Sequence, residues 1–178
     1  QRALESDQRG ARALNAVLAL DPLLALRGPF RLHLAMLDAA LDKITEGDSV
    51  KRALGLEARG RARVARGRGA EAAQDFEALL TFAEHDNAFE LQGRAHSYLG
   101  SVARLRGNQG EARRLLEQAL ALHRQVGDRR MEGRTLSNLA ALLDELGQEV
   151  EALASFQAAL EIHREVGDRR YEGVTLSN

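Results

Sequence analysis

Apolar side chains recur at helical spacing in the first third of the chain. Between Phe30 and Thr45 they are separated by intervals of 3, 4 and 3 residues, at Leu34, Leu37, Leu41 and Ile44. This spacing puts all four on one side of a helix. The pattern therefore predicts an amphipathic helix over residues 30–45.

Residues 11–26 are rich in leucine and alanine, which suits a buried helix, but Asp21 and Pro22 interrupt them. An aspartate followed by a proline is typical of a helix N-cap and the first residue after it. We therefore expect one helix that ends near Leu20 and a second, short helix that starts at Pro22.

The last part of the chain contains one phrase twice. Residues 121–138 read ALHRQVGDRRMEGRTLSN, and residues 161–178 read EIHREVGDRRYEGVTLSN, 40 positions later. A fixed period of this length is the mark of a solenoid, in which each unit buries its apolar side against its neighbours. The sequence thus predicts a stack of helical repeats.

The same 40-residue step aligns further positions from residue 50 onward. They are Gly67, Gly107 and Gly147; Ala72, Ala112 and Ala152; Phe76, Leu116 and Phe156; and Gly60, Gly100 and Ala140. Gly107 and Gly147 are expected to end helices with a positive φ, and Asp128 and Asp168 to cap the helices that follow. Gly47 and Asp48, two periods before Gly127 and Asp128, place the start of the repeats near residue 49.

Composition narrows the choice of partner. The chain has 178 residues, of which 44% are apolar and 29% charged, with 25 basic and 26 acidic side chains. A net charge near zero favours neither nucleic acid nor an anionic membrane surface as partner. Without cysteine, disulfides and thiolate chemistry are excluded, and we expect a cytoplasmic protein.

The sequence contains no recognisable set of catalytic or cofactor-binding residues. No nucleophile accompanies a plausible base, and no carboxylate pair stands apart from the general charge pattern. His123 and His163 lie one whole period apart, too far to be joint metal ligands, and are read as cations near helix C-termini. We expect no enzyme, no metal and no cofactor.

The runs LGSVARLRGNQGEARRLLEQAL, from Leu99, and LAALLDELGQEVEALASFQAAL, from Leu139, resemble the tetratricopeptide repeat. The 40-residue period and the VGDRR phrase are similar to the longer repeats of the LGN and kinesin-light-chain type, which also occur in sensor regions of bacterial signalling proteins. The resemblance implies an all-α, right-handed α-solenoid of antiparallel helix pairs. It divides the chain into divergent N-terminal helices at 1–48 and a solenoid at 49–178, with repeats near 49–87, 88–127 and 128–167 and a truncated first helix at 168–178.

In such a solenoid the first helices line a concave groove that takes a peptide or protein segment. Leu136, Leu139, Ala140 and Leu143 mark the packed stripe of one first helix. The side facing the groove is expected to hold Arg94, Ser97, Tyr98, Ser101, Arg134, Ser137, Asn138, Ala141 and Asn178. The resemblance implies that Asn138 and Asn178 contact the ligand backbone, while arginine suits a ligand carboxylate. Recent duplication of the whole phrase explains the two asparagines equally well.

Six arginines gather between Arg52 and Arg68. Arg59, Arg63 and Arg66 share one side of a helix and suit an acidic segment or a phosphate. The alternative is that they are solvated or paired with Glu57 and Glu71.

We therefore predict a scaffold that binds a protein or peptide segment, as the docking or sensing region of a larger protein. Two alternatives stay open. One is a ligand-responsive domain that switches an attached kinase, cyclase or DNA-binding module, and the other is a structural oligomerisation spacer. A first helix without its partner leaves an apolar side uncovered, so self-association through the C-terminal repeat face also stays open.

Overall fold

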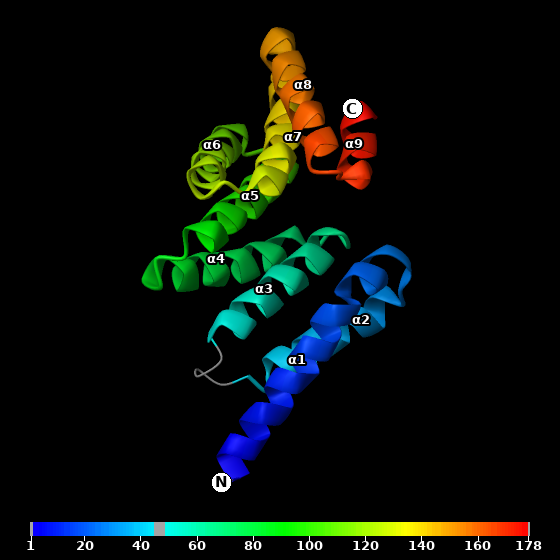
Figure 1. Cartoon of the computed structure of the whole chain (residues 1–178), viewed down its shortest axis with the longest axis vertical. Helices are drawn as coiled ribbons and strands as arrows, with labels where there is room; N and C mark the ends of the chain where they lie inside the picture. The colour runs from blue at the N-terminus through cyan, green and yellow to red at the C-terminus, as the bar shows by residue number, and fades with distance from the viewer. Residues whose placement is uncertain (1, 45–48, 178) are drawn as a thin grey trace. The chain divides into compact units, whose positions relative to one another are not determined.

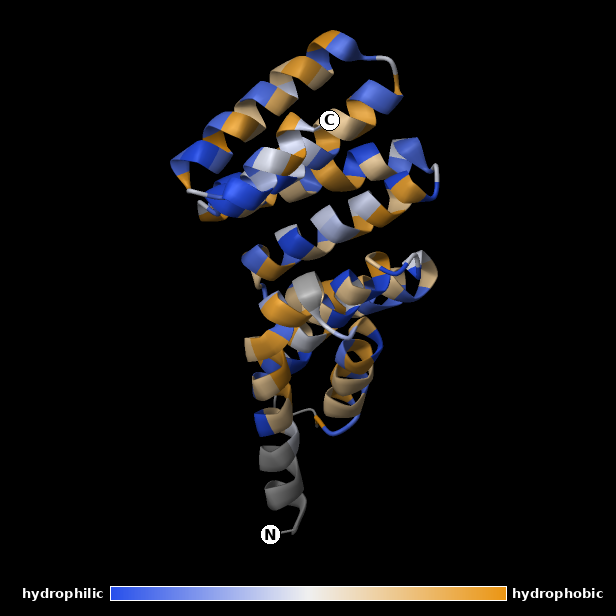
Figure 2. Cartoon of the chain, turned by 90° about the vertical axis from the view of Figure 1, so that its right-hand side faces the viewer, coloured by the Kyte–Doolittle hydropathy of each residue, from blue (hydrophilic) through white to orange (hydrophobic). Residues whose placement is uncertain are grey.

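The computed structural model describes residues 2–44 and 49–177, and all regular secondary structure in these ranges is α-helical. Two compact units divide the chain, Gln1–Phe82 and Ala83–Asn178, called unit 1 and unit 2 below (Figure 1). Apolar and polar residues alternate along the helices (Figure 2), so that one side of each helix packs. The predicted all-α fold of helix pairs is confirmed.

Unit 1 contains α1 (Arg2–Arg27), α2 (Phe30–Leu41), α3 (Ser49–Val64) and most of α4 (Gly69–His85). Unit 2 contains α5 (Phe89–Leu105), α6 (Gln109–Val126), α7 (Arg129–Glu145), α8 (Glu149–Glu165) and α9 (Arg169–Leu176). The first helices α3, α5, α7 and α9 begin at residues 49, 89, 129 and 169, and the second helices α4, α6 and α8 at 69, 109 and 149. The 40-residue period read from the sequence is thus the period of the helices.

From α3 onward, a residue with left-handed backbone conformation separates each helix from the next. Gly107 and Gly147 have φ of 79° and 73°, as predicted, and Gly67, Gly127 and Gly167 also have positive φ. Asn87, with φ 51°, stands one period before Gly127 and takes the same conformation without being glycine. The side chains of Asp128 and Asp168 accept hydrogen bonds from the backbone N–H groups of Met131 and Tyr171, so both predicted caps are confirmed.

The prediction that α1 breaks at Asp21 and Pro22 is wrong. Helix α1 continues through Pro22 to Arg27. Asp21 does not cap a new helix, because its buried carboxylate is paired with Arg61 of α3 and lies 3.2 Å from His33 of α2. These tertiary contacts hold the carboxylate away from the backbone, and the proline stays in the helix interior.

The predicted helix at 30–45 is shorter than expected. It ends at Leu41, and Ile44 is buried without being helical. The four apolar positions that predicted it, Leu34, Leu37, Leu41 and Ile44, are all buried. Thr45, Gly47 and Asp48 lie outside the described residues.

The predicted repeats correspond to helix pairs α3–α4, α5–α6 and α7–α8, followed by α9. The boundary between the compact units falls within α4, whereas the sequence suggests a division at residue 48. A compact unit need not begin where a repeat begins. The division predicted at residue 48 therefore stays a prediction. In unit 2 the predicted stripe of Leu136, Leu139, Ala140 and Leu143 is buried as expected.

Candidate functional site

Side chains on α5 and α7 form a half-buried polar surface in unit 2. We call this surface the first-helix face; it consists of Arg94, Tyr98, Ser101, Arg134, Asn138 and Ala141. Each of these side chains is neither fully buried nor fully exposed. Each of these predicted site residues therefore keeps part of its surface exposed.

Asn138 links the two helices of this face. Its side-chain nitrogen donates to Ser101 Oγ at 3.0 Å, and Ser101 Oγ donates in turn to the carbonyl of Ser97 at 2.9 Å. No described residue hydrogen-bonds to the side-chain oxygen of Asn138. The amide is therefore held in one orientation with its acceptor available to an incoming N–H group.

Arg134 and Arg94 are used within the fold. Arg134 Nη2 lies 2.9 Å from Asp168 Oδ2, and its guanidinium stands 4.2 Å from the centre of the Tyr171 ring. Arg94 Nη2 donates to Glu90 Oε1 one turn earlier on α5, and lies 4.0 Å from Asp128 Oδ2 of the following repeat. Each arginine thus pairs with the aspartate that caps the next first helix, so a ligand carboxylate would compete with an internal one.

Arg134 affects the pKa of its partner Asp168. Burial alone would raise the pKa of the Asp168 carboxyl, but the hydrogen bond and charge of Arg134, with the backbone N–H of Tyr171 and the charge of Arg130, together lower that pKa. Asp168 is therefore an anion at neutral pH. The pair joins α7 to α9.

Ser97 and Ser137 do not face a groove. Both are buried, because they lie between neighbouring helices instead of on the first-helix face. Ser97 Oγ lies 3.0 Å from Thr135 Oγ1, and Ser137 Oγ lies 2.8 Å from Thr175 Oγ1. Their recurrence from one repeat to the next reflects packing between repeats, which corrects the prediction for these two residues. Asn178 lies outside the described residues.

Two histidines belong to the same buried seam. His123 and His163 are fully buried, and His163 Nε2 lies 3.1 Å from Ser137 Oγ. Burial lowers the pKa of both imidazoles, and neighbouring carboxylates such as Asp128 and Asp168 only partly offset it. The two histidines are therefore neutral at pH 7, and the prediction that they act as cations at helix ends is wrong. Sequence reasoning missed this seam, although the periodic recurrence of histidine, serine and threonine was its signal.

The arginines of unit 1 form an internal network. Arg59 Nη2 lies 2.7 Å from Asp75 Oδ1, and Arg63 Nη1 lies 2.6 Å from Asp75 Oδ2. Asp38 of α2 also pairs with both guanidiniums, at 3.0 Å and 3.5 Å. The expected pairing with Glu71 is found, since Glu71 pairs with Arg68 and its Oε2 lies 3.9 Å from Arg63 Nε. Aspartates on α2 and α4 make the closer contacts with Arg59 and Arg63. A phosphate or acidic segment would have to displace these aspartates.

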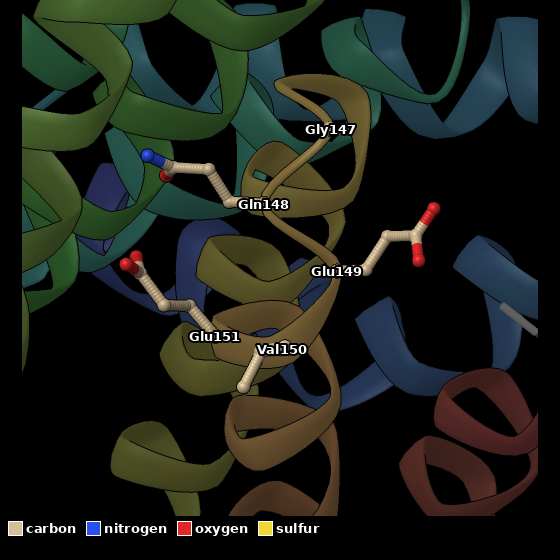
Figure 3. A pocket seen from close by; sticks show the side chains of 5 residues that line it. All are labelled: Gly147, Gln148, Glu149, Val150 and Glu151. Atoms are coloured by element: carbon tan, nitrogen blue, oxygen red, sulfur yellow. The ribbon is translucent and has the colours of Figure 1, made fainter.

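A shallow hollow also lies at the start of α8, lined by Gly147, Gln148, Glu149, Val150 and Glu151. Figure 3 shows the carboxylates of Glu149 and Glu151 pointing to opposite sides of the helix. The negative charges of these two carboxylates disfavour the binding of an anion in this hollow. Within the described ranges, no group of three or more His, Cys, Asp or Glu is placed to hold a metal ion. Nor is any described helix long and apolar enough to cross a membrane.

Comparison with known proteins places these features in a family. Residues 91–165 match the tetratricopeptide repeat family model. No curated protein matches the chain by sequence. Tetratricopeptide repeats typically bind protein or peptide segments.

Three solved structures share the fold at low identity. Aspartyl phosphate phosphatase F from Bacillus subtilis superposes with a TM-score of 0.78 at 11% identity, covering 93% of this chain and 44% of that chain. PlcR from Bacillus thuringiensis, solved with the peptide PapR7 and DNA, gives 0.77 at 15% identity, covering 98% and 71%. The nearly identical TPR-like repeats of a kinesin light chain from Podosopora anserina give 0.69 at 18% identity, covering 94% and 93%.

The chain spans less than half the length of the Bacillus subtilis phosphatase. At these identities the likeness concerns the fold alone. The helix pairs, their 40-residue period and the family match together identify residues 91–165 as tetratricopeptide repeats.

Proposed function

We propose that the first-helix face of unit 2 binds an extended peptide or protein segment, and that the chain is a docking or sensing region without catalysis of its own. The observation that carries this proposal is the position of Asn138. It is half-buried, fixed by Ser101, and keeps its amide oxygen available. An amide fixed in this way suits the backbone of an extended segment, which offers an N–H group at each residue.

Neighbouring side chains support the same assignment. Tyr98 stands one period before Asn138, at the equivalent position of α5, and is likewise half-buried. Tyrosine contributes a large apolar surface with a polar end, a combination that is common at interfaces. Ala141, one helical turn after Asn138, leaves room for a ligand side chain.

A second candidate function is regulation of an attached domain by a bound peptide. The similarity to PlcR, solved with a peptide and DNA, favours it over a structural spacer. Both functions use the same face. They differ in whether binding alters the activity of another domain.

The proposal is tested with random linear peptides selected for binding to the chain. We expect the double variant Tyr98→Ala/Asn138→Ala to lower the affinity for a selected peptide by about tenfold or more, equal to about 1.4 kcal/mol of binding free energy. Fluorescence anisotropy measures this affinity. Arg94 and Arg134 are left in place, because they pair with the capping aspartates.

The matched control replaces Gln118 and Gln157, two exposed polar residues on the second helices α6 and α8, by alanine. This variant should bind like the parent. Full affinity in a folded Tyr98→Ala/Asn138→Ala variant would show that the first-helix face is not the binding site.

A further inference from the structure

A leucine near the end of α5 lies in line with two members of the first-helix face. Leu105 follows Ser101 by four positions and Tyr98 by seven, so the three side chains lie on one side of the helix. Leu105 is 64% exposed, whereas most leucines of unit 2 are buried or half-buried. The first-helix face therefore continues into an apolar surface.

The next repeat does not cover Leu105. Helix α6 packs against α5, and α7 lies alongside it. Asn138 of α7 donates to Ser101 Oγ at 3.0 Å, and Arg104 Nη1 donates to Glu145 Oε1 near the ends of the two helices. Both contacts join α7 to the stretch of α5 that leads to Leu105. The leucine is thus exposed with the neighbouring helix pair in place.

The arginines on this side of α5 and α7 are already matched by carboxylates of the fold. Arg104 pairs with Glu145, which stands at the position of α7 equivalent to Leu105. Arg94 and Arg134 pair with the aspartates that cap the following first helices. A ligand carboxylate would have to replace an internal carboxylate at each of these arginines, so it would gain little binding free energy.

Arg106 directly follows Leu105 and is exposed, but it points in another direction. It is the C-cap of α5 and keeps a right-handed helical backbone conformation. Its side chain therefore projects about 100° around the helix from that of Leu105. At this end of the first-helix face, the accessible group in line with Ser101 and Tyr98 is apolar.

We propose, on the basis of the function proposed above, that the bound segment presents a large aliphatic side chain to Leu105 and needs no acidic residue. Four residues of α5 span about 6 Å from Ser101 to Leu105. An extended segment covers the same distance in about two residues. A segment whose backbone is held by Asn138 can therefore place a nearby aliphatic side chain on Leu105, and this contact removes apolar surface of both from water.

The test uses a peptide that is selected for binding to the chain from random linear peptides. We expect Leu105→Gln to lower the affinity for this peptide by about tenfold or more, because glutamine keeps the helix propensity of leucine but loses the apolar contact. The matched control is Leu153→Gln, since Leu153 is 60% exposed and lies on the second helix α8. This control should bind like the parent in fluorescence anisotropy.

Changes in the peptide separate apolar from charged recognition. Replacing its large aliphatic residue by alanine should cost about tenfold or more against the parent chain. The same replacement should cost little against Leu105→Gln, since both changes remove one contact. Replacing the acidic residues of the peptide by the matching amides, or Arg106 by glutamine, should leave the affinity within about threefold.

Two sets of variants distinguish a role of Leu105 from the binding function itself. If no peptide is selected, or if a folded Tyr98→Ala/Asn138→Ala variant keeps full affinity, the proposed function fails and the role of Leu105 with it. If that variant binds weakly while Leu105→Gln binds like the parent, only the role of Leu105 is overturned. The same holds if selected peptides have no large aliphatic residue, or if binding requires an acidic residue or Arg106.

Discussion

Equivalent positions of the two units are filled by opposite chemistry. In unit 2, Leu139 and Leu143 of α7 belong to a buried apolar cluster. At the same positions two periods earlier, in unit 1, Arg59 and Arg63 of α3 converge on Asp75, whose side chain is 3% exposed. The helices nevertheless start at the same 40-residue intervals. The comparison shows that glycine punctuation and helix length set the repeat, while the stripe between helices tolerates either leucines or a closed ion-pair network.

The largest effect on stability is expected from removing Asp75, the shared partner of Arg59 and Arg63. Asp75→Ala leaves the guanidiniums of Arg59 and Arg63 without their shared buried partner, and should lower the free energy of unfolding by about 3–5 kcal/mol. Urea denaturation followed by circular dichroism measures this. A loss below about 1 kcal/mol, as for an exposed ion pair, would show that Asp38 and solvent suffice to satisfy both arginines.

A second variant gives unit 1 the apolar chemistry of unit 2. The triple variant Arg59→Met/Arg63→Met/Asp75→Leu removes the charges of this group except that of Asp38, whose side chain is 42% exposed. Since apolar residues of similar volume can replace a buried ion network without loss, this variant should be more stable than Asp75→Ala. If it is the less stable of the two, the ion pairs themselves are essential for the packing of α3.

The corresponding change in unit 2 is Leu139→Ala. It removes a buried leucine from the α7 stripe and should cost about 2–5 kcal/mol. Tyrosine fluorescence reports on this unit directly, since Tyr98 and Tyr171 both belong to it. A transition unchanged from the parent would mean that the site collapses around the smaller residue.

A smaller, pH-dependent effect should come from the buried imidazoles of unit 2. Their pKa values are lowered by burial, whereas histidine in an unfolded chain titrates near pH ~6.5. The unfolded state therefore binds more protons below about pH 6.5, and stability is full above this pH and declines as the pH falls. The slope is at most about 1.4 kcal/mol per pH unit for each histidine.

The control for this prediction is the double variant His123→Leu/His163→Leu, compared with the parent between about pH 7 and 5. It should show a shallower decline, with His96, whose pKa burial also lowers, contributing to what remains. An equally steep decline in the variant would assign the pH dependence to other groups.

The fold was predictable because its signals are local. Glycines at 107 and 147, aspartates at 128 and 168 and the duplicated phrase each specify a backbone conformation without reference to distant residues. The helix break predicted at Pro22 is wrong for the opposite reason. Whether Asp21 caps a helix depends on Arg61 and His33, which are distant in sequence.

The candidate site was predictable only in part. Spacing predicts Asn138 and Tyr98 outside the packed stripe, and both are half-buried. It could not separate them from Ser137, directly before Asn138, because the burial of that serine depends on α8 and α9. Nor did it show that Arg134 is matched by Asp168, the N-cap of α9.

The two units also differ at the position that matters for function. Tyr98 and Asn138 are half-buried in unit 2, whereas their equivalent in unit 1, Ala58, is buried in an apolar cluster with residues of α1 and α2. We therefore propose that the ligand binds to unit 2. Amide chemical-shift mapping with a selected peptide tests this most directly. Shifts concentrated on α5 and α7 around Ser101 and Asn138 are the predicted result, and shifts concentrated on α1 to α3 would contradict it.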